Sequence, residues 1–471
     1  MSLLFNALSG AQAAQAALAT TSQNIANVMT PGYSRQGVVL ASVGGNASNV
    51  SASGGGVTVA TLQRYSDSFK NLQMWSAASN LGKADASQPY LDQLEQVMSD
   101  DTSNVNAGLD QFFAALNAAS VEPDSSPLRA QVITAADGLA KRFGSLQQLL
   151  QNQASAVSAQ RQAIVTQINT LNSDIAELNK QISANQAIGL NPAALQDTRD
   201  QRIDALASLV GIQVVDQPDG TRNVSLKSGQ PLVVGGDAAQ LAVNALVGGS
   251  HSLSLKFANT SFTVQGTDFG GQLGGLESFE GAVLAPMQQT VREMASGIAN
   301  AFNAQLAQGV DTTQTPLATG TGKPLFVDPA TNGGQLQLTG ISADELAFSL
   351  DPAAAGDSQN LTKLIALQGK PITLTNFDAK GQPLPTSSQV VLGDAYTQLI
   401  GKLGVASQQN IASQKTAQTV RDQAEESWKS TSGVNEDEEA VNLVQYQQMY
   451  QANMKVLAVA NELFDSTLQI L

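Results

Sequence analysis

Hydrophobic residues recur every seven positions in three separate stretches of the chain. Near the amino end the series is Leu4, Ala11, Leu18 and Ile25. Near the carboxyl end it is Leu443, Tyr450, Leu457, Phe464 and Leu471. A seven-residue repeat among strong helix formers predicts coiled-coil helices with one apolar seam each. We therefore expect such a helix within residues 1–35 and another over 434–471.

The third and longest repeat lies in the first half of the sequence. Its members are seven residues apart, other apolar residues lie four positions after several of them, and only Arg161 interrupts the pattern. The members are Leu150, Val157, Ile164, Leu171 and Leu178, with Ala154, Ile168, Ile175 and Ile182 between them. This predicts a long helix that packs within the chain, followed by a shorter one from about 193 that begins after Asn191-Pro192.

Between the helical segments the period changes to two, which is typical of strands. Valine-rich runs flank a Gly- and Ser-rich stretch within 36–65 and predict a hairpin with a long loop. Alternating runs from 213 to 264, with Asp219-Gly220 as a hairpin turn signal, predict a β domain over 211–274.

The whole pattern predicts a multidomain α+β protein. A long coiled-coil helical stem is built from both termini and the central helices, and β-rich outer domains are inserted into it. The stem comprises helical segments at 66–210, 275–309 and 391–433. A second inserted β-rich domain is expected over 310–390, where Gly, Pro, Thr and Asp surround short apolar runs.

The two terminal seams are too thin to form a complete core. Ala11 is one of the members at the amino end, and short helices that bury little apolar surface are marginal in water. We expect both ends to be largely disordered in the free monomer and to be completed by neighbouring copies. The predicted self-assembly interface is therefore the nine seam residues of the two ends.

Composition excludes several classes of function. The formal charge is −15, with 24 Lys plus Arg against 39 Asp plus Glu, which disfavours binding to nucleic acid or to an anionic membrane. The chain has no cysteine and one histidine, His251, so a catalytic triad or a multi-histidine metal site is not available. We predict a turn or strand-edge position for His251.

Other chemical motifs are incomplete. Gly-Thr-Gly-Lys at 320–323 resembles a phosphate loop, but Leu317 replaces its first glycine and Pro324 follows the lysine. Acidic pairs such as Asp100-Asp101 and Glu425-Glu426 suit a glycosidase by composition alone. We predict no enzyme activity, no cofactor and no metal site.

The amino end lacks the features of a cleaved signal or a membrane span. Arg35 is the first charged side chain, so no basic region precedes the apolar run. Polar residues interrupt that run well before the roughly 20 apolar residues that a bilayer requires. We expect no membrane association.

Both ends of the chain resemble one family. Ser22-Gln23-Asn24-Ile25-Ala26-Asn27 and Thr30-Pro31-Gly32-Tyr33-Ser34-Arg35-Gln36 are similar to the amino-terminal signature of bacterial flagellar rod, hook and hook-associated proteins. Ser432-Gly433-Val434-Asn435 and the later Tyr446-Gln447-Gln448, Tyr450-Gln451-Ala452-Asn453 and Ala460-Asn461-Glu462-Leu463-Phe464 resemble the last helix of the hook-associated members.

The resemblance implies a structural axial protein of the flagellum, exported unfolded by the type III apparatus to the hook–filament junction outside the cell. It also implies a ring of copies at the distal end of the hook, with the hook protein, a second junction protein and an export chaperone as partners. The alternative is a secreted adhesin or effector with coiled-coil ends.

Overall fold

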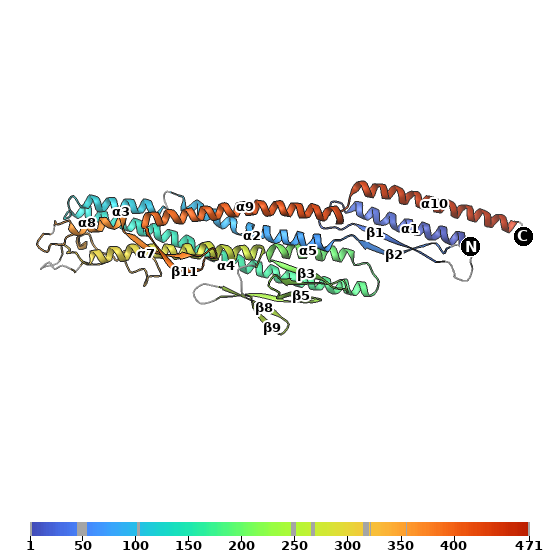
Figure 1. Cartoon of the computed structure of the whole chain (residues 1–471), viewed down its shortest axis with the longest axis horizontal. Coiled ribbons are helices and arrows are strands. Elements are labelled where there is room, and N and C mark those ends of the chain that lie inside the picture. Colours follow the sequence, from blue (N-terminus) through green and yellow to red (C-terminus); the bar gives the residue numbers. More distant parts are fainter. Residues whose placement is uncertain are drawn as a thin grey trace. The chain divides into compact units, whose positions relative to one another are not determined.

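The computed structural model describes residues 2–44, 54–100, 104–245, 251–264, 269–313, 320, 322–354 and 356–469. Long helices make up most of it, and small antiparallel sheets lie between them in sequence (Figure 1). The helices are α1 (Ser2–Ala26), α2 (Ser68–Met98), α3 (Val105–Ala119), α4 (Ser126–Ala187), α5 (Ala193–Leu209), α6 (Gly271–Phe279), α7 (Ala285–Leu306), α8 (Gln359–Ala366), α9 (Leu392–Ser432) and α10 (Glu436–Gln469). The predicted α+β class is therefore confirmed, whereas the coiled-coil geometry stays a prediction.

The chain forms two compact units. Unit 1 comprises Met1–Gly82, Ile164–Gly271 and Thr416–Leu471, and unit 2 comprises Lys83–Ala163 and Gln272–Lys415. The helices α2, α4 and α9 each continue from one unit into the other. The boundaries between the units fall inside helices and not between predicted domains. The division therefore does not test the eight predicted domain ranges, which stay a prediction.

Unit 1 holds most of the strands. The predicted hairpin is present as β1 (Gln36–Ser42) paired antiparallel with β2 (Val57–Arg64). A four-stranded sheet has the order β3 (Ile212–Asp216), β4 (Arg222–Leu226), β5 (Pro231–Val234) and β6 (Asp237–Ala238). A three-stranded sheet follows, with β7 (Gln240–Ala245), β8 (His251–Phe257) and β9 (Thr260–Val264). The turn between β3 and β4 contains Asp219-Gly220, and Gly220 adopts a φ of 77°, as the turn signal predicts.

The long helix α4 buries its seam within the chain. Val157, Ile168, Ile175 and Ile182 have no exposed surface. Within unit 1, asparagines on the same helix bind the backbone of the sheets. Asn169 exchanges hydrogen bonds with Leu241 at 2.7 and 2.8 Å, and the Asn179 amide donates to the carbonyl oxygens of Arg222 and Gly235. The helix therefore fixes the position of the inserted β segments in unit 1 through polar as well as apolar contacts.

Unit 2 has an aromatic core. Phe112 and Phe113 of α3 pack on Phe302 of α7 with ring centroids 5.0 and 5.8 Å apart, and Phe326 meets Phe302 edge to face. Arg161, the residue that interrupts the seam of α4, is fully buried and pairs with Glu277 and Glu280 beside a π-helical turn (Glu280–Leu284). A buried ion pair thus replaces one apolar contact of the seam.

The region predicted to be a second β-rich domain contains less strand than expected. Among its described residues, the named strands are β10 (Pro371–Phe377) and β11 (Pro383–Val391), which form one hairpin. The preceding part has two isolated bridges and the helix α8. Buried Arg129 holds part of this region by donating to the carbonyl oxygens of Pro123 and Ala343 at 2.6 and 2.8 Å. In this part of the chain, hydrogen bonds from the Arg129 side chain to backbone carbonyl oxygens replace the strand pairing that the sequence pattern predicts.

Candidate functional site

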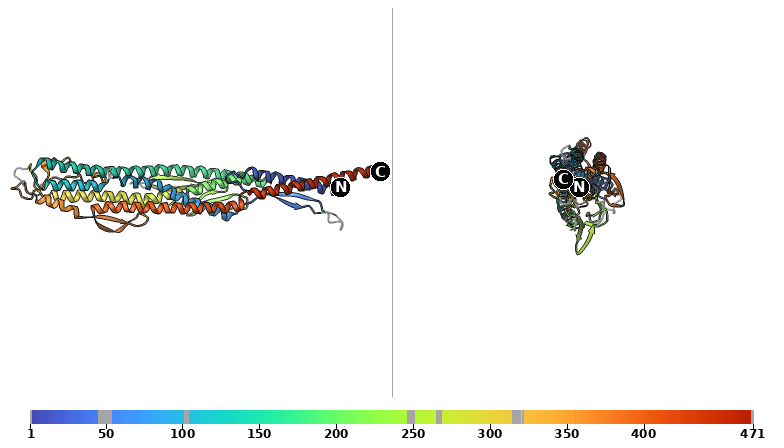
Figure 2. Two further views of the ribbon diagram at one scale, coloured as in Figure 1. Left: turned by 90° about the horizontal axis from the view of Figure 1, so that it is seen from above. Right: turned by 90° about the vertical axis from the view of Figure 1, so that its left-hand side faces the viewer.

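The two terminal helices pack against each other in unit 1 as an antiparallel pair (Figure 2). Gly10 of α1 lies against Asn453 of α10, whereas Ala17 and Thr21 share a small cavity with Glu439 and Tyr446. The contact face of α1 consists of small side chains, and a Cβ added at Gly10 would lie 2.5 Å from the Asn453 Oδ1. The buried residues on this face are Ala7, Gly10, Ala11, Ala14, Ala17 and Thr21. Small residues allow a close approach but bury little apolar area.

The predicted seam of α10 does not coincide with its contact face. Glu439, Tyr446, Asn453 and Ala460 repeat every seven residues and are buried or half-buried toward α1. The predicted seam begins four positions after the first of them. Of the predicted residues, Leu443 is 36% exposed, Tyr450 and Leu457 are half-buried, and Phe464 is 57% exposed. Leu471 lies outside the described residues.

On α1 the predicted seam is also only partly covered. Ala11 is buried, Leu4 and Leu18 are half-buried, and Ile25 is 36% exposed. Further large apolar side chains on the two helices are exposed, namely Leu3, Phe5, Leu8, Val441, Val444, Met454, Val456, Val459 and Leu463. Exposed apolar surface of this extent is typical of interaction sites. The pair therefore has an interior of its own and an apolar exterior, and the role of the nine seam residues in assembly stays a prediction.

The signature sequence after α1 folds around one buried side chain, Asn24. Its amide nitrogen donates to the Gln36 carbonyl at 2.8 Å, and its Oδ1 accepts from the Gln36 backbone N–H at 3.1 Å. The same oxygen accepts from the Tyr33 hydroxyl at 2.9 Å. Asn24 thus closes a loop of twelve residues and fixes the start of β1.

Glycine is required within this loop. Gly32 adopts a φ of 73°, and a Cβ there would lie 2.6 Å from the Gln201 Nε2. That amide donates to the Pro31 carbonyl at 2.6 Å. The Pro-Gly pair therefore brings the loop into contact with α5.

The residues after Tyr33 attach the loop to four other segments of unit 1. The Ser34 backbone N–H donates to the Asp197 Oδ2 at 3.2 Å, and the Arg35 N–H donates to the Ser432 carbonyl at 2.7 Å. The Arg35 guanidinium lies 4.5 Å from the centre of the Tyr65 ring, and its Nη1 is 2.5 Å from the Glu438 Oε2. Arg35 therefore contacts both the end of α9 and the start of α10.

The start of α10 has the cap that its sequence predicts. The Asn435 side chain accepts from the backbone N–H groups of Asp437 and Glu438 at 3.0 and 3.3 Å. The acidic run 436–439 occupies the first turn, where the helix dipole stabilises negative charge. Its members differ in environment, because Glu438 pairs with Arg35 in solvent whereas Glu439 is 2% exposed.

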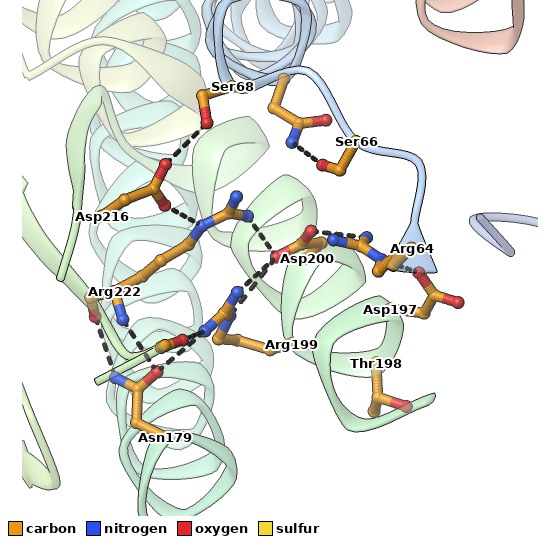
Figure 3. A network of polar contacts seen from close by, with 12 residues as sticks. Arg64, Ser66, Ser68, Asn179, Asp197, Thr198, Arg199, Asp200, Asp216 and Arg222 are labelled. Atoms are coloured by element: carbon orange, nitrogen blue, oxygen red, sulfur yellow. Dashed lines mark hydrogen bonds and ion pairs between the residues drawn. The ribbon is translucent and has the colours of Figure 1, made fainter. Parts of the chain in front are cut away.

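Asp197, which accepts from the Ser34 backbone N–H, belongs to a buried network of ion pairs (Figure 3). Arg64 at the end of β2 binds Asp197 at 2.7 Å and Asp200 at 2.8 Å, both on α5. Arg222 of β4 also binds Asp200, and it reaches Asp216 of β3 at 2.5 Å. Salt bridges buried to this degree depend on complete pairing, because an unpaired charge in such a place is costly. The network therefore connects the hairpin, α5 and the four-stranded sheet.

Asp197 and Asp200 of α5 have opposite pKa shifts. Burial raises the pKa of Asp197, and Arg64 and the Ser34 N–H only partly oppose it. Burial also acts to raise the pKa of Asp200, but the guanidinium groups of Arg222, Arg64 and Arg199 outweigh it and lower the pKa. Burial, with Asp197 and Glu439 nearby, raises the pKa of Tyr33 to about 12, so this hydroxyl is a hydrogen-bond donor at neutral pH.

Sequence reasoning did not identify the network or the role of Asn24. Asp197 and Asp200 are three residues apart, which places both on one face of α5, and this spacing is a signal that was available. Their partners Arg64 and Arg222 lie in separate strands, and periodicity does not indicate which strands meet.

Residues of the candidate chemical motifs have structural positions in the fold. Lys323 of the phosphate-loop fragment pairs with Glu345, and His251 is the first residue of β8. Glu425 pairs with Lys429 one helical turn away. The described ranges contain no group of three or more His, Asp or Glu side chains that could hold a metal ion, and none of their helices is long and apolar enough to span a bilayer.

The chain is similar to known flagellar proteins along its whole length. Flagellar hook-associated protein 1 of Escherichia coli (strain K12) is 29% identical, with 100% of both chains covered. The protein of the same name from Bacillus subtilis (strain 168) is 29% identical over 97% of this chain and 95% of that one. Among solved structures, the flagellar hook junction protein FlgK from Burkholderia pseudomallei shares the fold, with a TM-score of 0.65 at 17% identity over 76% of this chain and 99% of that chain.

Family models match three segments. The model of the flagellar basal body rod protein covers residues 4–33, and the model of the C-terminal part of the basal body rod FlgEFG proteins covers residues 430–470. These two segments contain the terminal helices and the signature loop. The model of the helical domain of flagellar hook-associated protein FlgK covers residues 91–326, which is half of the chain. The chain therefore belongs to the FlgK family of flagellar hook-associated proteins.

Proposed function

We propose that this chain is a structural subunit of the bacterial flagellum that joins the hook to the filament. It assembles as a ring at the distal end of the hook through the outer faces of α1 and α10. The observation that supports this role is the terminal helix pair. The face of α1 that packs on α10 consists mainly of alanine, while large apolar side chains such as Phe5 and Val459 are 64% and 53% exposed.

The names of the relatives support the location. Those from Escherichia coli and Bacillus subtilis are called flagellar hook-associated protein 1, and the similar solved structure is described as a flagellar hook junction protein. The proposed neighbours are further copies of the chain, the hook protein and a second junction protein. An unpaired apolar exterior suits such contacts, because burying it against neighbours removes it from water.

The proposal includes export. The chain would leave the cell unfolded through the flagellar type III apparatus, accompanied by an export chaperone, and would act in the extracellular part of the flagellum. The absence of cysteine supports this route, since no disulfide can form before assembly.

Binding to isolated hooks tests the proposal. Leu443→Asp puts a charge on the predicted seam of α10, and Val215→Asp is a matched control on β3, where the valine is 58% exposed. We expect the unchanged chain and the control to decorate hook tips in electron micrographs, and Leu443→Asp to leave the tips bare. Equal decoration by both variants would contradict a role for the α10 seam.

A further inference from the structure

A loop of unit 2, residues 328–337, contains the one Asn-Gly pair of the chain, Asn332-Gly333. The loop is closed at its base, where the Val327 N–H donates to the Gln337 carbonyl at 2.8 Å. It reverses direction through two glycines in the left-handed region, with a φ of 63° at Gly333 and 82° at Gly334. The loop therefore has a defined shape in which the backbone at Gly333 is turned outward.

The Gly333 N–H is the one backbone donor between residues 330 and 335 that the loop leaves unused. The acceptors of the others are the Asp328 side chain for Ala330, the Asp328 carbonyl for Thr331, the Pro329 carbonyl for both Asn332 and Gly334, and the Asn332 carbonyl for Gln335. The Gly333 N–H makes no hydrogen bond to a described residue, and Gly333 is exposed. A Cβ placed on it would have no other atom within 4 Å. Neither a hydrogen bond nor a neighbouring atom therefore shields this nitrogen.

The Asn332 side chain supplies an electrophile next to that nitrogen. Its Nδ2 donates to the Gln337 Oε1 at 3.0 Å, and this is the hydrogen bond that holds the amide. The Cγ of an asparagine amide is open to attack by the backbone nitrogen of the following residue, which closes a five-membered ring. Glycine in that following position adds no side chain that would obstruct the ring closure.

We propose that Asn332 is a site of spontaneous deamidation in the folded chain. Hydroxide removes the proton of the Gly333 nitrogen, which attacks the Asn332 Cγ. A C–N bond forms, the bond from Cγ to Nδ2 breaks, and the nitrogen leaves as ammonia. Water from the solvent then opens the succinimide. Its addition at one carbonyl gives aspartate and at the other gives isoaspartate, and neither step needs an oxidant or a reductant.

The product carboxylate appears near a cation that has no acidic partner among the described residues. Arg292 of α7 lies against the loop, because a Cβ at Gly334 would be 2.7 Å from the Arg292 Cδ. The Arg292 Nη2 donates to the Gln289 Oε1 at 3.1 Å. Arg292, Gly333 and Gly334 also line a cavity of about 930 Å³ within unit 2. Deamidation would therefore change the charge beside this cavity.

The pair Asp219-Gly220 provides a contrast within the same chain, because it can form the same ring with loss of water. There the Gly220 N–H donates to the Gln217 carbonyl at 3.1 Å. The Asp219 Oδ1 accepts from the Thr221 N–H at 3.0 Å and from the Thr221 hydroxyl at 2.6 Å. The turn thus engages both the nucleophile and the carboxylate. We expect Asp219 to be protected by the fold and Asn332 not to be.

Mass spectrometry of the full chain tests this difference. The chain is incubated folded at neutral and at mildly alkaline pH, and in parallel unfolded in guanidinium chloride. Fragment spectra locate the replacement of NH2 by OH at Asn332, and an isoaspartyl methyltransferase detects isoaspartate at both positions. We expect Asn332 to convert at similar rates in the folded and the unfolded chain, and faster at the higher pH. Conversion at Asp219 should be severalfold slower in the folded chain than in the unfolded one.

Two variants identify the source of the ammonia. Asn332→Gln keeps an amide but would have to form a larger ring, so ammonia release from the folded chain should be lost. Asn259→Gln is the matched control, because Asn259 is exposed in the turn between β8 and β9 but precedes a threonine. It should release ammonia as fast as the unchanged chain.

Three results would overturn the proposal. Conversion of Asn332 in the unfolded chain alone would mean that the fold shields the pair. Equal slowing of Asn332 and Asp219 on folding would mean that the unbonded Gly333 N–H makes no difference. Equal ammonia release from Asn332→Gln and Asn259→Gln would assign the reaction to another residue.

Discussion

The helices α4 and α10 have the same seven-residue repeat but different surroundings. On α4, Val157 and Ile175 are fully buried within the chain. On α10, Leu443 and Phe464 are 36% and 57% exposed at equivalent positions of the repeat. A repeat therefore predicts a helix with an apolar side, but it does not tell whether the same chain or another molecule covers that side.

The residues that face each seam account for the difference. In unit 1, α4 lies beside strands whose backbone binds Asn169 and Asn179 and whose large side chains, such as Leu241, are buried. The partner of α10 is α1, whose contact face is mostly alanine with Gly10 and Thr21. A face of small residues covers a strip of its neighbour and leaves the flanks in water.

The largest expected effect is on α4. Ile168→Asp places a charge at a position with no exposed surface and should lower the free energy of unfolding by about 4 kcal/mol or more. Urea denaturation of the isolated chain, followed by circular dichroism, measures it. Ile168→Val is the control and should cost about 1 kcal/mol. Equal costs for the two variants would mean that this part of α4 is not buried.

A smaller effect is expected in the ion-pair network. Asp200→Asn leaves Arg64 and Arg222 without a shared carboxylate and should cost about 3 kcal/mol at neutral pH. Asp197→Asn should cost less at that pH, because the pKa of Asp197 is raised and its charged form is already disfavoured by burial. Denaturant midpoints of the two variants provide the comparison, and the reverse order would contradict the pKa assignment.

The opposite pKa shifts of Asp197 and Asp200 predict how the stability of the fold depends on pH. The pKa of Asp200 is lowered in the folded chain, so its contribution to stability is present above its unfolded value of about 4 and is lost as pH falls through the folded value. For Asp197 the sign is opposite, because a raised pKa stabilises the fold below the unfolded value and that contribution is lost as pH rises. Asp200→Asn should therefore weaken the loss of stability in acid, and Asp197→Asn should not.

Asn24 is expected to have the next largest effect. Asn24→Ala removes the side chain that bonds both polar groups of the Gln36 backbone and the Tyr33 hydroxyl, at a cost of about 2 kcal/mol. Asn27→Ala removes an exposed side chain that bonds the Gln23 carbonyl and the Thr30 hydroxyl, and it should cost under about 0.5 kcal/mol. Thermal unfolding distinguishes the two, and a similar loss in both would mean that the loop does not depend on Asn24.

Periodicity and turn chemistry predicted the elements well. The helix start after Asn191-Pro192, the turn at Asp219-Gly220 and the cap at Asn435 all depend on local rules, and the structure confirms them. The heptad pattern also placed Ile164 and Ile182 in a core. These features depend on residues close together in sequence, which is the range over which such patterns carry information.

Contacts between distant segments were not predictable in the same way. Asp197 meets Ser34 and Arg64 across more than 130 residues, and no local rule selects those partners. The contact between α10 and α1 was not predictable either. The large apolar residues of α10, such as Leu443, form the seam predicted for neighbouring copies, whereas α1 contacts the smaller or polar positions Asn453 and Ala460 because its own face consists of small residues.

The smallest expected effect is on α10, and it is the counterpart of the prediction for Ile168→Asp on α4. Phe464→Asp should change the free energy of unfolding of the isolated chain by less than about 0.5 kcal/mol, because the ring is largely in water. The same denaturation experiment as for Ile168→Asp measures it. A loss above about 2 kcal/mol would show that the chain itself covers this residue, and the contrast between the two helices would then disappear.

Amide hydrogen exchange extends this test without a substitution. If neighbouring copies complete the terminal helices, amides of residues 2–30 and 440–469 should exchange rapidly in the monomer, while those near Ile175 in α4 remain protected. Assembly should slow the first group and leave the second unchanged. Strong protection of the terminal helices in the dilute monomer would mean that the alanine-lined contact with α1 is a sufficient core, and the exposed apolar side chains would then need a reason other than self-assembly.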